Sequence, residues 1–262
     1  MKLLKQLHLV AAGIALGLSL TSTAMAAAPA PAAPAGPSVV IVHGAFADGS
    51  DWAKVIPLLQ VQGVPVVAVQ NPLTSLADDV AATRRAIDLQ AGKVVLVGHS
   101  WGGTVITEAG NSDKVAGLVY VAAFAPDAGQ SSGEMGAAYP PAPGMAHITA
   151  DKGGYLRLTP QGLAQHFAQD LPAATTAVMA ATQGPIHASA FEHKVGSAPA
   201  WKSKPSWFVV SQADHMIQPA LQLAMAQKMG AQVTRLDASH LPQQSRPAEV
   251  AAVILKAVAS AR

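Results

Sequence analysis

The sequence predicts an α/β fold: a mostly parallel sheet of about six strands with helices on both faces. Three observations lead to this prediction. Short β-branched runs alternate with segments whose apolar residues recur at helical spacing, which is typical of a parallel sheet covered by helices. The run at 94–97 is apolar without a break, as expected for a strand buried on both faces. Half of the 262 residues are apolar, which suffices for one large core.

The first half of the predicted domain begins at residue 38 and contains four strands and three helices. The strands are expected at 38–42, 64–69, 94–97 and 115–122. The helices between them are expected at 51–62, 75–90 and 102–110. Pro57 lies inside the first helix and is expected to kink it. Asp78 and Asp79 lie in the first turn of the second, where the helix dipole favours acidic residues.

The alternation stops between 127 and 200. This segment is rich in Pro, Gly and Ala, and it contains helix-like pieces without a strand pattern. It predicts a small, mainly helical cap inserted over the strand ends, within a domain that spans 38–262. Strands and helices then resume, with strands expected at 207–211 and 232–236 and helices at 219–229 and 246–258.

The first 26 residues are typical of a signal peptide. Lys2 and Lys5 precede an apolar stretch, and small residues before the end of the segment fit cleavage after Ala26. An uncleaved anchor is the alternative, although the apolar stretch is short for a membrane span. The Ala- and Pro-rich segment 27–37 predicts a linker. We therefore expect a bacterial protein exported to the periplasm or secreted, with no stable membrane insertion after cleavage.

The composition excludes several other classes of function. Removing residues 1–26 takes away two lysines and no acidic residue, so the formal net charge of +2 becomes 0. A near-neutral body gives no reason to expect nucleic acid or an anionic membrane surface as a partner. The absence of cysteine excludes disulfides, a thiol nucleophile and a lipid-anchored cysteine. The sequence contains no repeat and no coiled coil that would indicate an interaction protein. It leaves the oligomeric state open.

The motif GHSWGG at 98–103 predicts the nucleophile. It follows the strand at 94–97 and opens a helix, which is the context of a G-x-S-x-G turn. In so sharp a turn only glycine fits beside the serine, and the hydroxyl of Ser100 is exposed at the apex. The helix N-terminus offers free N–H groups and a positive dipole end to an oxyanion. The alternative is an ordinary glycine-rich turn.

Asp214 and His240 are the predicted acid and base. Each follows a predicted strand, and in a parallel sheet the loops after the strands emerge at the same edge as Ser100. Their order along the chain, Ser, Asp, His, is the order expected for a triad on this kind of sheet. Three alternatives remain: Asp214 only caps the following helix, His240 is a surface-loop residue, or Asp237 is the acid.

Two backbone N–H groups form the predicted oxyanion hole. One belongs to Trp101, after the nucleophile, and the other to Ala45, in the loop after the first strand, with Phe46 as its alternative. The residues expected around the substrate pocket are His43, Gly44, His99, Phe124 and Leu241. Three apolar cap residues are expected to pack between cap and body rather than to touch a substrate: Tyr139, Met145 and Phe167.

No metal and no other cofactor is expected. Hydrolysis by a Ser–His–Asp triad needs neither. Structural and catalytic zinc sites usually show closely spaced ligand pairs in the sequence. The four histidines of the predicted cap show no such spacing: His147, His166, His187 and His193.

Together these segments resemble the α/β-hydrolase superfamily over about residues 38–260. The resemblance rests on HGAF at 43–46, GHSWGG at 98–103, ADH at 213–215 and SH at 239–240. The chain is most similar to a compact branch that includes plant methyl-ester esterases and hydroxynitrile lyases. The hydroxynitrile lyases that this chain resembles have a lysine directly after the catalytic histidine and a threonine in the oxyanion loop. This chain has Leu241 and Gly44 there, and an apolar leucine cannot hold a cyanide anion, which favours ester hydrolysis.

The sequence therefore predicts a serine hydrolase, most specifically a carboxylesterase that cleaves small to medium apolar esters through a Ser–His–Asp triad and an acyl-enzyme. One alternative is the same triad used on an amide, a lactone or a carbon–carbon bond, or for perhydrolysis, since many chemistries share this fold and triad. The other alternative is a non-catalytic ligand-binding protein on the same fold, against which the complete triad argues.

Overall fold

Six parallel strands form the central sheet of the computed structural model, which describes residues 36–196 and 198–261. Their order across the sheet is β2-β1-β3-β4-β8-β9, and every neighbouring pair is parallel. The strands are β1 Ser38–Val42, β2 Val66–Val69, β3 Val94–His99, β4 Val115–Val121, β8 Ser206–Ser211 and β9 Gln232–Leu236. The predicted α/β fold is confirmed. The predicted signal peptide and most of the predicted linker lie outside the described residues.

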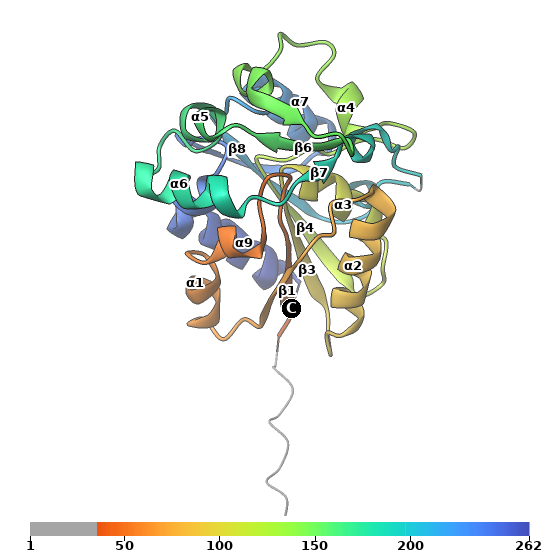
Figure 1. Ribbon diagram of the computed structural model, residues 1–262. Coiled ribbons are helices and arrows are strands. Elements are labelled where there is room, and N and C mark those ends of the chain that lie inside the picture. The colour runs from red at the N-terminus through yellow and green to blue at the C-terminus, as the bar shows by residue number, and fades with distance from the viewer. Residues whose placement is uncertain (1–35, 197, 262) are drawn as a thin grey trace, which may run out of the picture. The chain divides into compact units, whose positions relative to one another are not determined.

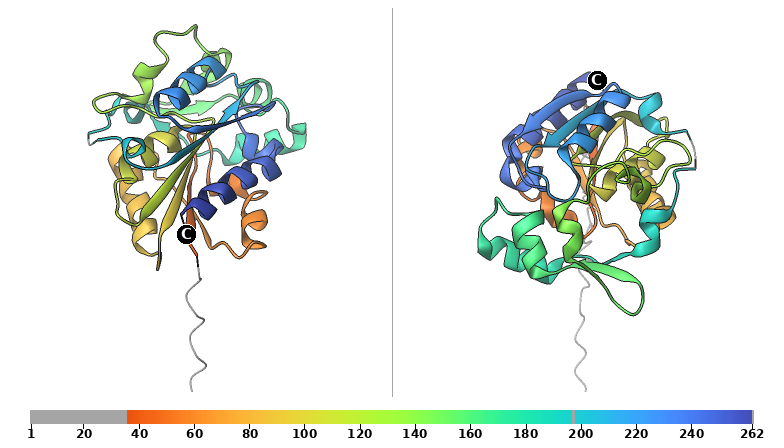
Figure 2. Two further views of the ribbon diagram at one scale, coloured as in Figure 1. Left: turned by 180° about the vertical axis from the view of Figure 1, so that it is seen from behind. Right: turned by 90° about the horizontal axis from the view of Figure 1, so that it is seen from above.

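Helices cover both faces of the sheet because strand side chains alternate between two cores. In β1, Val40 and Val42 belong to one core, and Val39 and Ile41 belong to the other. Helices α2, α3 and α7 pack on the first face, and α1 and α9 pack on the second (Figures 1 and 2). The helices of the body are α1 Ile56–Gln60, α2 Leu76–Asp88, α3 Trp101–Ala109, α7 Pro219–Lys228, α8 Pro242–Ser245 and α9 Pro247–Ser260. None of the helices in the described part of the chain is long and apolar enough to cross a membrane.

The segment 51–62 is not the single kinked helix that we predicted. Gly49–Trp52 forms a 3-10 helix, and α1 begins only at Ile56. Pro57 lies in the first turn of α1, where a missing N–H leaves no helical hydrogen bond unmade, so it starts a helix instead of kinking one. Leu59 in α1 is still fully buried, as is Trp52, so the expected apolar face is kept across the break.

The insertion over the strand ends contains strands, so the expectation of helical pieces without strands is wrong. Strands β5, β6 and β7 form a small antiparallel sheet (Figure 1, green to cyan). Each is two to four residues long, which is too short to leave an alternating pattern in the sequence. The elements of the insertion are α4 Ser132–Met135, β5 Ile148–Ala150, β6 Tyr155–Leu158, α5 Pro160–Gly162, α6 Ala173–Thr182 and β7 Ile186–His187, together with 3-10 helices at Pro143–His147, Ala188–Glu192 and Ala200–Lys202 and a π-helix at Leu163–Phe167.

Asp51, in the 3-10 helix before α1, is a buried carboxyl group. Its Oδ2 atom has no hydrogen-bond partner among the residues that the structure describes. Burial raises the pKa of Asp51 to about 7, and the nearby charge of Asp48 adds to this effect. An acid with a higher pKa in the folded than in the unfolded protein lowers stability when it ionises. This loss of stability therefore grows as the pH rises from about 4, the unfolded value, to about 7.

We expect Asp51→Asn to stabilise the protein at pH 8 and to change its stability little at pH 4. Asn has nearly the same size without the buried charge, and a pKa shift of this size corresponds to at most about 4 kcal/mol. The free energy of unfolding, measured by urea denaturation at both pH values, tests this. Asp88→Asn removes an exposed carboxyl group at the end of α2 and is the matched control. Equal effects of Asp51→Asn at both pH values would contradict the role given to the buried charge.

Candidate active site

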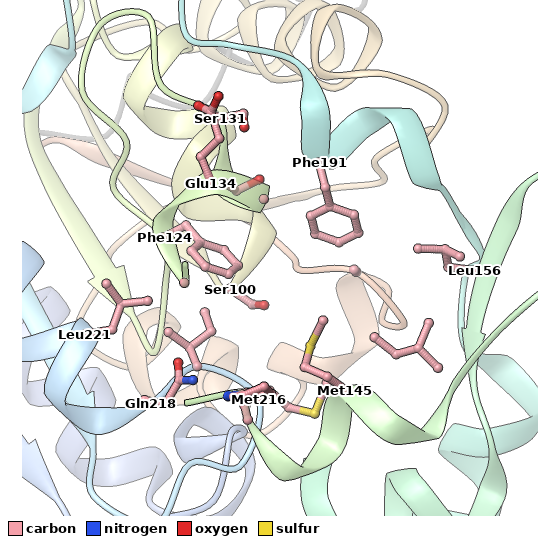
Figure 3. A pocket seen from close by; sticks show the side chains of 18 of the residues that line it. Ser100, Phe124, Ser131, Glu134, Met145, Leu156, Phe191, Met216, Gln218 and Leu221 are labelled. Carbon is pink, nitrogen blue, oxygen red and sulfur yellow. The ribbon is translucent and has the colours of Figure 1, made fainter. Parts of the chain in front are cut away.

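Ser100 lies at the apex of a sharp turn between β3 and α3. Its backbone has φ +51° and ψ −119°, a strained conformation for a serine. Backbone hydrogen bonds hold the turn: Ser100 N donates to the carbonyl of Val121 at 3.2 Å, and the Ser100 carbonyl accepts from Phe124 N at 3.1 Å. The turn thus fixes the backbone of Ser100 at the end of β3, with its side chain projecting into a cavity (Figure 3).

The glycines of the motif are required because other segments pass close to them. A Cβ atom on Gly98 would lie 2.6 Å from the carbonyl oxygen of Gly102. A Cβ atom on Gly102 would overlap the carbonyl oxygen of Val42, at the end of β1. A Cβ atom on Gly103 would overlap the carbonyl oxygen of Phe124. The glycines of the motif therefore have a steric reason in this structure.

Asp214 and His240, from the loops after β8 and β9, are hydrogen-bonded to each other. Asp214 Oδ2 lies 2.7 Å from His240 Nδ1, and both side chains are buried. Because a carboxylate oxygen accepts, the neutral ring of His240 carries its proton on Nδ1 and leaves Nε2 unprotonated. Asp237, the alternative acid, is exposed. His240 is 1% exposed, so it is not a surface-loop residue.

Asp214 also accepts from the backbone of its own loop. Its Oδ1 atom accepts from Met216 N at 2.7 Å and from Ile217 N at 3.0 Å, just before α7 begins. Asp214 therefore does cap the loop before α7, which was the alternative role considered for it. Oδ1 makes these capping bonds, and Oδ2 is bonded to His240. The loop contacts therefore orient the carboxylate toward the imidazole.

His240 Nε2 is the atom that a general base would use. It is buried and has no hydrogen bond within residues 36–196 and 198–261. His240 and Ser100 line the same cavity. Chemically, this arrangement can transfer a proton from a hydroxyl group while the opposite ring nitrogen stays bound to a carboxylate.

His99 does not line the cavity but contacts His240. Its Nε2 atom donates to the backbone carbonyl of His240 at 2.8 Å, and the two rings lie 4.8 Å apart. Full burial holds the pKa of His99 well below its usual value, and the neighbouring His240 lowers it further. His99 therefore stays neutral and holds the backbone of His240 without adding a charge.

The loop after β1 lies against the nucleophile, as the oxyanion-hole prediction requires. Ala45 and Phe46 line the same cavity as Ser100, and Phe46 has a positive φ of 60°. A Cβ atom on Gly44 would lie 2.8 Å from the Cβ of Ser100, so the loop can approach only with glycine at this position. His43, in the same loop, accepts a hydrogen bond at Nε2 from Asn71 N at 2.9 Å. Burial lowers the pKa of His43.

Asp79 is a buried residue near the site. From the sequence we expected it only as an acidic residue in the first turn of a helix. Its Oδ2 atom accepts from the indole Nε1 of Trp101 at 2.7 Å, and its Oδ1 atom accepts from Leu73 N at 2.8 Å. Burial raises the pKa of Asp79 to about 6 despite these hydrogen bonds. Asp79 thereby anchors the side chain of Trp101, the first residue of α3 and the predicted oxyanion donor.

A cavity of about 720 Å³ lies between the strand ends and the insertion. Its lining is mostly apolar, and Figure 3 shows Ser100 facing an open space bounded by Phe124, Phe191, Met145 and Met216. The body supplies one side and the insertion supplies the other. Such a cavity suits an apolar small molecule whose reacting group sits beside Ser100.

Several predictions about the lining need correction. Of the five residues expected around the pocket, only Phe124 lines the cavity. His43, His99 and Leu241 are buried beneath its wall, and Gly44 has no side chain to reach it. Met145 and Phe167 do line it, although we expected them only to pack between cap and body, whereas Tyr139 packs as expected. The missed wall residues include Ile148, Leu156, Ala188, Phe191, Met216 and Leu221.

Two histidines of the insertion, His147 and His166, lie close together near His215. His166 contacts His147 and His215: the ring centroids lie 4.8 and 5.4 Å away, and His166 Nδ1 is 3.2 Å from His215 Nδ1. Across the described residues, no group of three histidine or acidic side chains is arranged to hold a metal ion. Burial lowers the pKa of His166, and its two histidine neighbours lower it further.

The chain is similar to known proteins in sequence and in fold. A family model described as "Alpha/beta hydrolase family" matches residues 39–253. A probable hydrolase, R7, of Phoma sp. is 27% identical over 246 residues, which are 83% of this chain and 96% of that protein. Methylesterase 2 of Arabidopsis thaliana is 35% identical over 108 residues, 34% of this chain and 40% of that protein. A crystal structure of a pyrethroid hydrolase superposes with a TM-score of 0.74 at 22% identity, covering 86% of this chain and 98% of that chain.

Proposed function

We propose that this chain, which belongs to the alpha/beta hydrolase family, is a serine carboxylesterase that acts on neutral, apolar esters. One observation carries the proposal. Ser100 and His240 line one apolar cavity, and the imidazole is bound through its far nitrogen to the buried carboxylate of Asp214. This is the arrangement that activates a serine hydroxyl for attack on an acyl group.

The proposed reaction begins with transfer of a proton to His240. Nε2 takes the proton of the Ser100 hydroxyl while the serine oxygen attacks the ester carbonyl. The resulting tetrahedral oxyanion accepts from the backbone N–H of Trp101 and from that of Ala45 or Phe46. His240 then returns the proton to the leaving alkoxide, the alcohol departs, and the acyl group stays on Ser100.

The second half of the reaction uses the same groups with water. His240 removes a proton from water, the hydroxide oxygen attacks the acyl carbonyl, and collapse of the intermediate frees the acid and restores the Ser100 hydroxyl. Asp214 holds the imidazole in one orientation and stabilises its cationic form throughout. These steps are complete with the chain's own residues.

The cavity lining supports an apolar and uncharged substrate. Apolar side chains from both the body and the insertion surround Ser100. The acidic residues of the lining are Glu134, which is ion-paired with Lys194 at 3.0 Å, and the exposed Glu192, and neither offers a positive charge to a substrate carboxylate. A volume of about 720 Å³ can accept esters of small to medium size.

A panel of p-nitrophenyl esters of increasing acyl length tests the proposed function. We expect turnover, with kcat/KM rising with acyl length until the chain fills the cavity and then falling. The matching p-nitroanilides keep the acyl group and replace the ester with an amide, so they control for bond type. Preferred cleavage of the anilides, or no turnover of any ester, would contradict the carboxylesterase proposal.

Export is a separate part of the proposal and is supported by the sequence of residues 1–26. The protein should accumulate in the periplasm or the medium of a bacterial host. Its measured mass should be that of a chain that begins at residue 27. A cytoplasmic protein with an intact N-terminus would contradict it.

A further inference from the structure

Gln222 is a fully buried amide next to the proposed triad. It lies on α7, is 0% exposed, and belongs to no motif of the sequence. Its Nε2 atom donates to Asp214 Oδ2 at 2.7 Å and to the carbonyl of Ile217 at 2.8 Å. Its Oε1 atom accepts from Ser211 N, at the end of β8, at 3.0 Å. Both ends of the amide are therefore paired.

These three contacts determine which way the amide points. Ile217 offers a carbonyl oxygen, which can only accept, and Ser211 offers an N–H, which can only donate. Turning the amide over would set its oxygen against a carbonyl and a carboxylate and its NH₂ against an N–H. Gln222 must therefore donate to Asp214.

Gln222 donates to the same carboxylate oxygen to which His240 is bonded. Asp214 Oδ2 accepts from Gln222 and from His240 Nδ1, both at 2.7 Å. The backbone N–H groups of Met216 and Ile217 occupy the other oxygen. Gln222 thus holds Oδ2 together with His240, while backbone N–H groups hold Oδ1.

We propose that Gln222 is a positioning residue of the active site, which acts through Asp214 to hold His240 in the orientation that Ser100 requires. This inference rests on the proposed function. Without the amide, the backbone would hold only Oδ1, and the carboxylate could turn about that anchor. A displaced Oδ2 would misalign the imidazole and slow every proton transfer through it.

The test compares two glutamines of the same helix. Gln222→Met keeps a similar length and removes the donor, and Gln227→Met makes the same change at an exposed position of α7. We expect Gln222→Met to lower kcat by roughly tenfold to a hundredfold, as a misplacement of about 1 Å can do, and to leave KM nearly unchanged. Gln227→Met should change neither value. Circular dichroism and thermal unfolding show whether each variant is folded.

A double-mutant cycle separates positioning from a purely structural role. In an Asp214→Ala background, the loss caused by Gln222→Met should disappear, because the residue through which it acts is gone. The same fractional loss of kcat in both backgrounds would overturn the inference. So would full activity of the single variant Gln222→Met.

One readout does not depend on the substrate. The proton shared by His240 Nδ1 and Asp214 can be followed by NMR as a downfield imidazole resonance. It should shift or exchange faster in Gln222→Met and stay unchanged in Gln227→Met. An unchanged resonance in Gln222→Met overturns the inference even if no ester is hydrolysed, whereas a shifted resonance without ester turnover supports the inference and counts against the proposed function alone.

Discussion

Replacing Ser100 with alanine is expected to lower kcat for ester hydrolysis by up to ~10⁶, the loss typical of a triad enzyme without its nucleophile. Ala removes the hydroxyl and adds nothing to the strained turn, so the fold and the cavity should persist. The measurement is kcat on the best p-nitrophenyl ester, with the thermal unfolding midpoint as the check on folding.

Ser132 provides the comparison for this result. It also lines the cavity, and its buried hydroxyl has no partner among the described side chains and backbone groups. It lies at the start of α4 and not in the turn between β3 and α3. If Ser132→Ala abolished activity and Ser100→Ala retained it, Ser100 would not be the nucleophile, and the role given to the turn between β3 and α3 would be wrong.

Asp214→Asn is expected to lower kcat by about 10⁴, because it inverts the proton arrangement on His240. The backbone N–H groups of Met216 and Ile217 require an acceptor at the Oδ1 position. Gln222 Nε2 donates at the Oδ2 position. Two donors at Oδ1 against one at Oδ2 favour the Asn oxygen at Oδ1, so the NH₂ group takes the place of Oδ2. That group donates toward His240 Nδ1, so the ring proton moves to Nε2, which can no longer accept from Ser100.

Asp237→Asn is the matched control for this variant. It makes the same chemical change on an exposed carboxylate only three residues before His240. We expect it to keep kcat within about a factor of two, as is usual for surface substitutions away from a site. Loss of activity in Asp237→Asn with retention in Asp214→Asn would identify Asp237 as the acid.

The body of the fold and its family were predictable because they depend on local patterns. The six strands were expected close to where they lie, since unbroken apolar runs such as 94–97 mark strands buried on both faces. Strand order along a parallel sheet then brings the loops after β3, β8 and β9 to one edge. That rule alone placed Ser100, Asp214 and His240 near each other without knowledge of any side-chain contact.

The insertion and the cavity were not predictable in the same way. The strands of β5–β7 are stabilised by one another and by the body rather than by their own residue pattern. Met145 and Phe167 look like packing residues in the sequence, and only their tertiary surroundings make them cavity walls. The predicted pocket residues flank motifs, but a position beside a motif says nothing about which way the side chain points.

The buried polar residues around the site were missed for a related reason. Asp78 and Asp79 are neighbours in the first turn of α2 and look equivalent in the sequence. Asp78 is exposed and bonded to Ser75 at the helix start, whereas Asp79 is fully buried against Trp101. Gln222 is likewise buried, with its partners in β8 and in the loop before α7, whereas Gln227 on the same helix is exposed. Such residues have no signature in the sequence, because the polar groups that they meet depend on how the neighbouring loops fold.

Labelling with a fluorophosphonate, followed by peptide mapping, tests the central claim most directly. The reagent forms a stable adduct with a serine that a neighbouring base has activated. We predict one adduct per chain, located on Ser100 and absent in both Ser100→Ala and heat-unfolded protein. An unlabelled native protein, or an adduct on any other serine, would contradict the claim that Ser100 and His240 form a catalytic pair.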